Sequence, residues 1–596
     1  MIKLPKNNFV FLETNRFDKN NSHSYLFFSP IKIISCYKLE EVKDSLLRVQ
    51  DFVSKGYYAA GFISYEAGFS FEEALEHLGI DSDFPLLWFG VYKRPAIFSH
   101  KEKINLSQKK SKYEIQNLKP NISKGKYIDD IERIKDFIRE GETYQVNYTF
   151  KYKFDFSGSI FSLYEDLKSK QSVSYSALVN TRKHSIVSLS PELFFRKHGS
   201  QVEVKPMKGT SERGRNIEEQ RRNMEALSQS LKNRSENIMI VDLLRNDLGR
   251  ISKSGSVKTE KLFEVEKYET LLQMISVVKS RLRENVSVYD LFKAIFPSGS
   301  VTGAPKISTM RIINSLENKP RKIYTGGIGF FAPNGDSVFN VAIRTVLINN
   351  KTKKGEMGIG SGIVMDSDAE REFEECKLKA DFMSKKKKDF KLIETILWRP
   401  EKGYFLLKWH LKRLSSSAEY FNFKFDKKSI MRELRHLEAY FEKKSDYKVR
   451  LLLNDSGAIE IKFSKIYDSI KPVRIRFSNK KICSKDIFLY HKTTQRDLYN
   501  KEHKRWKDKG YFDVIFTNEK NQITEGAISN IIVKKGRYCY TPPVNCGLLN
   551  GVYRRFLFKK KNPIITEKIL RKKDLYSADK IYVINSVKGM LKAELD

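Results

Sequence analysis

Two glutamates and a lysine near the middle of the chain have the spacing of one helix face. Glu372, Glu375 and Lys379 are three and four positions apart, within a segment (368–384) whose apolar residues repeat at the same intervals. This pattern predicts a helix with the three polar side chains on one side. In an isolated helix that side would be solvated. In a folded domain it could instead face a pocket.

A glycine-rich loop precedes this segment. Pro297–Lys306 contains Gly299 and Gly303, and glycines let backbone amides approach an anion. The loop is not a Walker phosphate loop, because only three residues separate the glycines and Ala-Pro follows the second one. Alone, it is weak evidence for an anion site.

Further motifs accompany the loop and the helix in the first half of the chain. In order, they are Ser190–Phe194, Pro206–Thr210, Glu236–Asn237, Val241–Leu248, Ala342–Thr345 and Gly360–Val364. Together they resemble the chorismate-utilising enzymes, over about residues 10–385. This family includes anthranilate synthase component I, aminodeoxychorismate synthase component I, and the isochorismate and salicylate synthases. The resemblance implies that the substrate is chorismate, a small dicarboxylate.

The resemblance also implies roles for individual residues. Expelling a ring hydroxyl from a dicarboxylate requires cationic groups or amides for the carboxylates and a Lewis acid for one of them. Glu236 and Glu375 are expected to bind Mg2+ directly, and Glu372 to assist from beside them. The other carboxylate would be met by Tyr324 and Arg344, assisted by the amides of Gly360, Ser361 and Gly362, and Ser300 would lie against the same ligand.

Lys208 distinguishes the branches of this family. Isochorismate and salicylate synthases resemble one another in having a lysine base where this chain has Gln145, and anthranilate synthases have alanine where this chain has Lys208. A lysine at the latter position marks aminodeoxychorismate synthase. A desolvated lysine can be neutral and nucleophilic, so Lys208 is expected to add at C2 of chorismate, with Glu192 as the acid for the departing hydroxyl. Gln273 stands where relatives often carry histidine.

The chain lacks the nucleophile motif of a glutaminase. None of its five cysteines lies in a Gly-x-Cys-x-Gly context, which would be needed to release ammonia from glutamine. We therefore expect a separate glutamine amidotransferase subunit as a partner.

The second half carries a different set of motifs. They are His410–Leu414, His491–Asp497, Ile523–Asn530 and Gly547–Arg555. They resemble the class IV aminotransferase fold over about residues 390–596, which implies pyridoxal 5'-phosphate as the cofactor. Lys492 would bind it covalently, and Glu525 would keep its pyridine nitrogen protonated. Arg413, unless it is an exposed helix arginine, would bind the phosphate together with the amides of Gly551, Val552 and Tyr553.

Fusion of the two halves narrows the function. Class IV members include branched-chain and D-amino-acid aminotransferases and aminodeoxychorismate lyase, which removes pyruvate from the expected product of the first half. Asn585–Gly589 also resembles the lyase branch. We therefore predict a bifunctional folate-pathway enzyme that converts chorismate to 4-aminobenzoate. The alternative is chorismate amination only, with a second half that is inactive or an aminotransferase.

These residues must be positioned by two domains. We predict an α+β protein: a chorismate-utilising two-layer β/α domain over residues 1–385, then a fold-type IV α/β domain over 390–596. The pattern predicts strands at 59–65 and 390–398, helices at 126–140 and 409–421, and a hairpin between strands 326–331 and 337–348. The boundary is placed at Met383–Asp389, around the basic run Lys385–Lys388.

Composition excludes several other classes of protein. The 596 residues are 40% hydrophobic and 31% charged, which is a globular balance. The net charge of +38 is spread along the chain, so no nucleic-acid partner is expected. No apolar run is long enough for a membrane helix, and no signal peptide is evident at the start. We expect a cytoplasmic protein that could dimerise through its second half.

Overall fold

The computed structural model describes residues 5, 7–16, 21–78, 82–99, 102, 112–171, 173–268, 271–383, 389–442, 444–466, 472–560 and 564–596. Contacts divide the chain into two compact units. The first contains residues 1–213 and 224–387, and the second contains residues 214–223 and 388–596. The basic run Lys385–Lys388 lies outside the described residues. No described helix is both long and apolar enough to cross a membrane.

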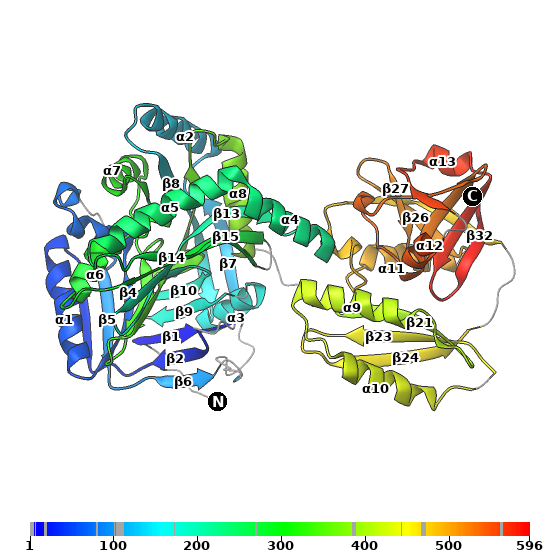
Figure 1. Cartoon of the computed structure of the whole chain (residues 1–596), viewed down its shortest axis with the longest axis horizontal. Coiled ribbons are helices and arrows are strands. Elements are labelled where there is room, and N and C mark those ends of the chain that lie inside the picture. Colours follow the sequence, from blue (N-terminus) through cyan, green and yellow to red (C-terminus); the bar gives the residue numbers. More distant parts are fainter. Residues whose placement is uncertain are drawn as a thin grey trace. The chain divides into compact units, whose positions relative to one another are not determined.

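Two antiparallel sheets form the framework of the first unit (Figure 1). The first sheet has the order β16 (Gly303–Ala304), β8 (Gln145–Gly158), β20 (Lys354–Ile363), β19 (Thr345–Asn349), β10 (His184–Ser190), β9 (Tyr175–Asn180), β1 (Phe9–Glu13), β2 (His23–Phe27) and β6 (Ala96–Ser99), with β7 (Tyr113–Pro120) paired to β8. The second has the order β13 (Met207–Glu212), β15 (Leu271–Arg281), β12 (Gln201–Lys205), β11 (Leu193–His198), β18 (Ser337–Val341), β17 (Gly327–Phe331), β4 (Tyr58–Ile63), β5 (Leu87–Tyr92) and β3 (Lys32–Cys36), with β14 (Lys258–Lys267) paired to β15.

Each sheet has its own layer of helices. An apolar core joins the first sheet to α2 (Lys124–Arg139), α3 (Ile160–Lys170), α7 (Lys306–Leu316) and α8 (Ala369–Ala380). A second core joins the other sheet to α1 (Val42–Ser54), α5 (Leu231–Gly249) and α6 (Val288–Ile295). A third core, which includes Phe62, Val179 and Phe330, lies between the sheets. The predicted β/α layering thus occurs twice in this α+β unit.

The predicted strand 337–348 is wrong in one respect. It is two strands in different sheets, β18 and β19, separated by a turn in which Arg344 has φ +52°. The amide of Ile343 bonds back to the carbonyl of Val341 at 2.7 Å, which starts this turn. The pattern could not reveal the break, because apolar residues continue on both sides of it.

The second unit contains a four-stranded and an eight-stranded sheet. The smaller sheet has the order β22 (Gly403–Tyr404), β21 (Leu392–Arg399), β23 (Tyr447–Leu453) and β24 (Ile459–Lys465), and it packs on α9 (Leu407–Phe421) and α10 (Lys427–Glu438). The larger has the order β27 (Ile523–Gly526), β26 (Asp513–Asn518), β25 (Val473–Ile482), β32 (Gly589–Leu595), β31 (Lys580–Asn585), β28 (Asn530–Lys535), β29 (Tyr538–Thr541) and β30 (Ile565–Glu567). Helices α11 (Asp497–Lys507), α12 (Val552–Lys559) and α13 (Lys572–Tyr576) accompany it.

A short segment from the first half of the sequence also belongs to the second unit. Residues 214–223 include the start of α4 (Ile217–Gln229). The hydroxyl of Tyr420 donates to the carbonyl of Gly214 at 2.7 Å, and His491 Nε2 lies 3.1 Å from the carbonyl oxygen of Arg215. Arg215 Nη1 donates to the Tyr490 hydroxyl at 2.7 Å.

Candidate active sites

Lys208 lies on β13 in a buried, charged part of the first unit. Its Nζ is 3.9 Å from Glu236 Oε2, on α5. Burial lowers the pKa of Lys208, although the carboxylate of Glu236 acts in the opposite direction. Gly362 leaves room for the amine, because a Cβ at that position would lie 2.3 Å from Lys208 Nζ. The structure thus brings Lys208, Glu236 and Gly362 together from three separate elements.

Glu372 and Glu375 project from α8, as the helical spacing predicts. Glu372 accepts a hydrogen bond from Ser367 Oγ at 3.1 Å, and both burial and the neighbouring Glu375 raise its pKa. Glu375 Oε1 lies 2.9 Å from Lys379 Nζ, which also donates to the carbonyl of Gly360 at 3.0 Å. A second cation therefore already neutralises part of this acidic face.

The three predicted metal ligands do not form a preformed cage. Within the described ranges, no group of three or more His, Cys, Asp or Glu side chains has the geometry to hold a metal ion. However, Glu236, Glu372 and Glu375 all act electrostatically on the Lys208 ammonium. These carboxylates are hard oxygen donors, and their chemistry fits an ion such as Mg2+, which binds one or two carboxylates and keeps several waters.

Glu192 and Ser300 form a direct contact in the same unit. Ser300 Oγ donates to Glu192 Oε1 at 2.6 Å, and both side chains are buried. Burial raises the pKa of Glu192 to about 7, against the hydrogen bond from Ser300. A carboxyl with this pKa can hold a proton near neutral pH and release it to a leaving group.

Gln145 carries a buried side-chain amide. Its side chain is fully buried, and among the residues that the structure describes neither its oxygen nor its nitrogen has a hydrogen-bond partner. Its Nε2 lies 3.2 Å from the position that a Cβ of Gly362 would take, and Lys208 Nζ lies beside the same point. Buried polar atoms are almost always satisfied, so this amide is available to a ligand next to Lys208.

The other predicted substrate contacts are less clearly assembled. Tyr324 is buried against Gly358 of β20, where a Cβ would lie 2.1 Å from its ring. Arg344 lies at the turn between β18 and β19, and its Nη1 donates to Gln171 Oε1 at 2.9 Å. Gly360 and Ser361 lie in β20 opposite Thr149 and Tyr148 of β8. Their roles toward a substrate stay predictions.

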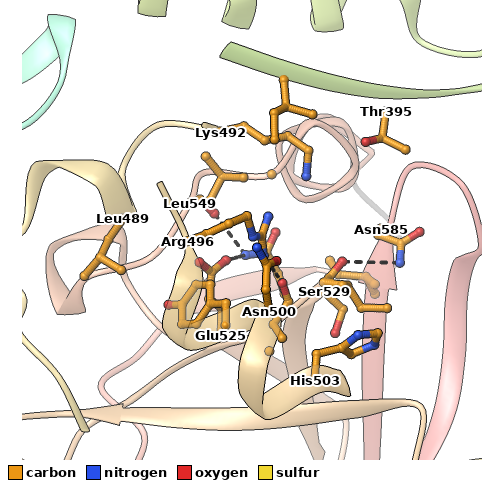
Figure 2. A pocket seen from close by; sticks show the side chains of 18 of the residues that line it. Thr395, Leu489, Lys492, Arg496, Asn500, His503, Glu525, Ser529, Leu549 and Asn585 are labelled. Atoms are coloured by element: carbon orange, nitrogen blue, oxygen red, sulfur yellow. Dashed lines mark hydrogen bonds between the residues drawn. The ribbon is translucent and has the colours of Figure 1, made fainter. Parts of the chain in front are cut away.

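A cavity of about 1190 Å3 is the main feature of the second unit (Figure 2). All six predicted cofactor residues line it: Arg413, Lys492, Glu525, Gly551, Val552 and Tyr553. Figure 2 shows the amine of Lys492 reaching into this space. Burial lowers the pKa of Lys492 to about 7, and the guanidinium groups of Arg496 and Arg413 act in the same direction. The amine is therefore substantially neutral at neutral pH.

Glu525 is a buried carboxyl on the other side of this cavity. Burial raises its pKa to about 8. Asn530 Nδ2 donates both to Glu525 Oε2 at 3.1 Å and to the carbonyl of Leu549 at 2.9 Å. A protonated pyridine nitrogen would be the cationic partner that such a carboxyl favours.

One of the expected phosphate-binding residues, Arg413, already makes hydrogen bonds to another side chain. Arg413 donates to both oxygens of Glu394, from Nε at 2.9 Å and from Nη2 at 2.6 Å, so it is not an exposed helix arginine. Although burial acts to raise it, Arg413 and His410 hold the pKa of Glu394 at about 2. Helix α12 begins at Val552 with Gly551 as its N-cap. A Cβ at Gly551 would lie 2.1 Å from Asn530 Oδ1.

Sequence motifs missed three residues of this second site. Asn530 joins Glu525 to the segment before α12, Arg496 lowers the pKa of Lys492, and Glu394 anchors Arg413. Asn530 and Arg496 both lie inside motifs that were recognised for other residues. Their side chains make contacts to backbone carbonyls or across strands, which residue type alone does not indicate.

A family model described as chorismate binding enzyme matches residues 10–385, which is more than half of the chain. The chain belongs to the chorismate-binding enzyme family. Residues 391–594 match the model for class IV aminotransferases. The expected families of both halves are thereby confirmed, together with the α+β fold class and the expectation of an enzyme.

Relatives of this chorismate-binding enzyme differ in length and in name. Aminodeoxychorismate synthase component 1 of Bacillus subtilis is 31% identical over 55% of this chain and 76% of its own length. The chloroplastic aminodeoxychorismate synthase of Arabidopsis thaliana is 39% identical over 44% of this chain, which spans only 28% of it. The crystal structure of anthranilate synthase component I from Streptococcus pneumoniae has a TM-score of 0.54 and 27% identity, covering 62% of this chain and 94% of that one.

Proposed function

We propose that the chain is a bifunctional enzyme of 4-aminobenzoate synthesis. The first unit would aminate chorismate to 4-amino-4-deoxychorismate, and the second would eliminate pyruvate from this product to leave 4-aminobenzoate. The proposal depends above all on Lys208, a largely buried amine with a lowered pKa beside Glu236. Relatives named for two different reactions share this fold, so the residue itself must decide between them.

Lys208 would act as the nucleophile of the first reaction. Its neutral amine forms a bond to C2 of chorismate while the C4–oxygen bond breaks. Glu192, with a pKa of about 7, gives its proton to the departing hydroxyl, which leaves as water. Ammonia then bonds to C4, the lysine nitrogen leaves C2, and the ring double bonds return to their positions.

Two further groups support this step. Glu236, Glu372 and Glu375 would hold Mg2+, which when bound supplies positive charge for a substrate carboxylate. The free amide of Gln145 beside Lys208 suits an uncharged nucleophile such as ammonia, because an amide cannot remove a proton from water as a lysine base does. The ammonia would come from a glutamine amidotransferase partner.

Lys492 and Glu525 would carry the second reaction. Pyridoxal phosphate, when bound, supplies an electron sink at the substrate carbon. The Nζ of Lys492, with a pKa of about 7, can accept a proton from one substrate carbon and return it to another. Glu525 holds the proton on the pyridine nitrogen, and Asn530 fixes the carboxyl of Glu525 in place.

Product analysis tests both halves of the proposal. The purified chain is incubated with chorismate, Mg2+, pyridoxal phosphate and ammonium at mildly alkaline pH, and the products are separated by chromatography. We expect 4-aminobenzoate and an equal amount of pyruvate. Anthranilate would contradict the role of Lys208. Accumulation of 4-amino-4-deoxychorismate by the wild-type chain would instead assign the second unit a different reaction.

The rate of amination should fall as pH rises above about 7. The proposed acid, Glu192, has a pKa raised to about 7 by burial, so its protonated fraction declines above that pH. The assay holds the concentration of free ammonia constant at each pH, because ammonia itself becomes more abundant at high pH. In Glu192→Gln most of the activity should be lost, and the remaining rate should no longer decline above about pH 7. An unchanged decline in the variant would assign it to another group.

Replacing Asn530 with alanine should weaken cofactor binding. The change removes one amide that joins Glu525 to Leu549, and losing such buried hydrogen bonds costs about 1–3 kcal/mol. We expect the variant to bind pyridoxal phosphate at least roughly tenfold more weakly than the wild type, as measured by titration of the cofactor absorbance band. Asn500→Ala, at another asparagine that lines the cavity, is the matched control. Equal affinities in the two variants would contradict this role.

A further inference from the structure

The first unit has two neighbouring hollows that none of the residues assigned above lines. Their volumes are about 620 and 320 Å3, and Asp83, Lys153, Lys322 and Glu356 line both. The two linings together contain six lysines and three carboxylates, a formal excess of three positive charges. The lysines are Lys119, Lys151, Lys153, Lys319, Lys322 and Lys354, and the carboxylates are Asp83, Asp155 and Glu356.

The strand register places like charges opposite one another. Lys153 on β8 is paired with Lys119 on β7, and like charges directly opposite in a sheet are destabilising. On its other side Lys153 is paired with Glu356 of β20. That carboxylate is already engaged by Lys151 at 2.6 Å, and Lys322 lies 3.8 Å from it. The charge of Lys153 therefore remains uncompensated.

Several of these ammonium groups have no partner. Among the residues that the structure describes, the side chains of Lys119, Lys153 and Lys319 make no ion pair or hydrogen bond. Lys151 is buried beside them, and burial lowers its pKa. His184 adds a buried ring to the same lining. An anion in the hollows would supply the counter-charge that this arrangement lacks.

We propose that these two hollows form a binding site for a small polyphosphate-class anion with at least three negative charges. The cationic side chains in the linings are lysines, with no arginine among them. Lysine ammonium groups bind phosphates as point charges, without the directional fork by which arginine binds carboxylates and phosphates alike. The excess of three positive charges sets the charge of the ligand.

The site shares its strands with the candidate active site. Strand β8 continues from Lys153 to Gln145, and β20 continues from Glu356 to Gly362. An anion bound in the hollows would contact both strands at a place separate from the candidate active site. The ligand site is nevertheless independent of the proposed reaction, since it depends only on the lysine linings.

Binding of inorganic tripolyphosphate to the full chain tests this inference. Titration calorimetry is performed on protein saturated with pyridoxal phosphate, in buffer without Mg2+ because tripolyphosphate chelates it. We expect saturable binding that weakens with added salt. The variant with Lys153→Gln and Lys319→Gln should bind roughly tenfold more weakly, since two exposed charge contacts are lost. Inorganic phosphate and citrate are the comparison ligands, and both should bind more weakly than tripolyphosphate.

A matched variant makes the test specific. Lys32→Gln removes an exposed lysine of β3 that lines neither hollow, and it should bind like the wild type. Both target lysines are exposed, so the midpoint temperature of thermal unfolding without ligand should be the same in the double variant as in the wild type, or slightly higher. Non-saturable binding, or equal affinity in the double and control variants, would overturn the site. Equal binding of citrate would overturn the phosphate class.

Discussion

Replacing Lys208 with alanine should abolish the formation of 4-amino-4-deoxychorismate. The amine is the proposed nucleophile, and burial lowers its pKa, which favours the neutral and reactive form. Removing a covalent catalyst of this kind typically costs about a thousandfold or more in rate. The measurement is the rate of product formation from chorismate with ammonium, and 4-aminobenzoate should also be absent.

The control for this variant is a lysine that lies outside the site. Lys232→Ala changes an exposed lysine of α5 and should leave the rate unchanged. Thermal unfolding should show that Lys208→Ala is folded, because Glu236 keeps some access to solvent and can be hydrated after its neighbour is lost. If Lys208→Ala retained more than about a tenth of the wild-type rate, the nucleophile would have to be another group.

Replacing Lys492 with alanine should stop the sequence of reactions after the first product. The variant keeps the first unit unchanged, so 4-amino-4-deoxychorismate should accumulate at the wild-type rate. Formation of 4-aminobenzoate and pyruvate should fall by about a thousandfold or more, because the proton carrier is lost. The absorbance band of covalently bound pyridoxal phosphate should also disappear.

Lys507→Ala is the matched control within the same cavity. Lys507 lines the cavity but is exposed, and no role in the reaction is proposed for it. It should retain both the cofactor band and the second product. Normal 4-aminobenzoate formation by Lys492→Ala would show that the second unit does not catalyse the lyase step.

Motif spacing predicted the parts of the sites that local structure determines. Glu372 and Glu375 share one side of α8 because helical geometry repeats every 3.6 residues, and the buried stripe beside them includes Phe373 and Cys376 as expected. The hairpin at Pro333–Asp336 also forms, with Gly335 at φ +81°. In both cases the residues that determine the local structure are neighbours along the chain, so the sequence pattern alone predicts it.

The remaining features depend on distant segments. Arg344 lies at a crossover between two sheets, and only the tertiary packing shows that the apolar run around it is divided. The isolation of the Gln145 amide results from what surrounds it, not from its own motif. Likewise, Asn530 binds the carbonyl of Leu549, which is 19 residues further along the chain. The roles assigned by resemblance to Tyr324, Arg344 and the three glutamates remain predictions.

The placement of residues 214–223 in the second unit bears on how the two units can be separated. A fragment that begins near residue 388 would match the class IV family but lack one of its own packed segments. It would also lose the Arg215 carbonyl beside His491, the residue that precedes Lys492. Conversely, a fragment that ends near residue 387 would carry that segment without its docking surface. A cut at a single position near residue 387 therefore separates this segment from the unit in which it packs.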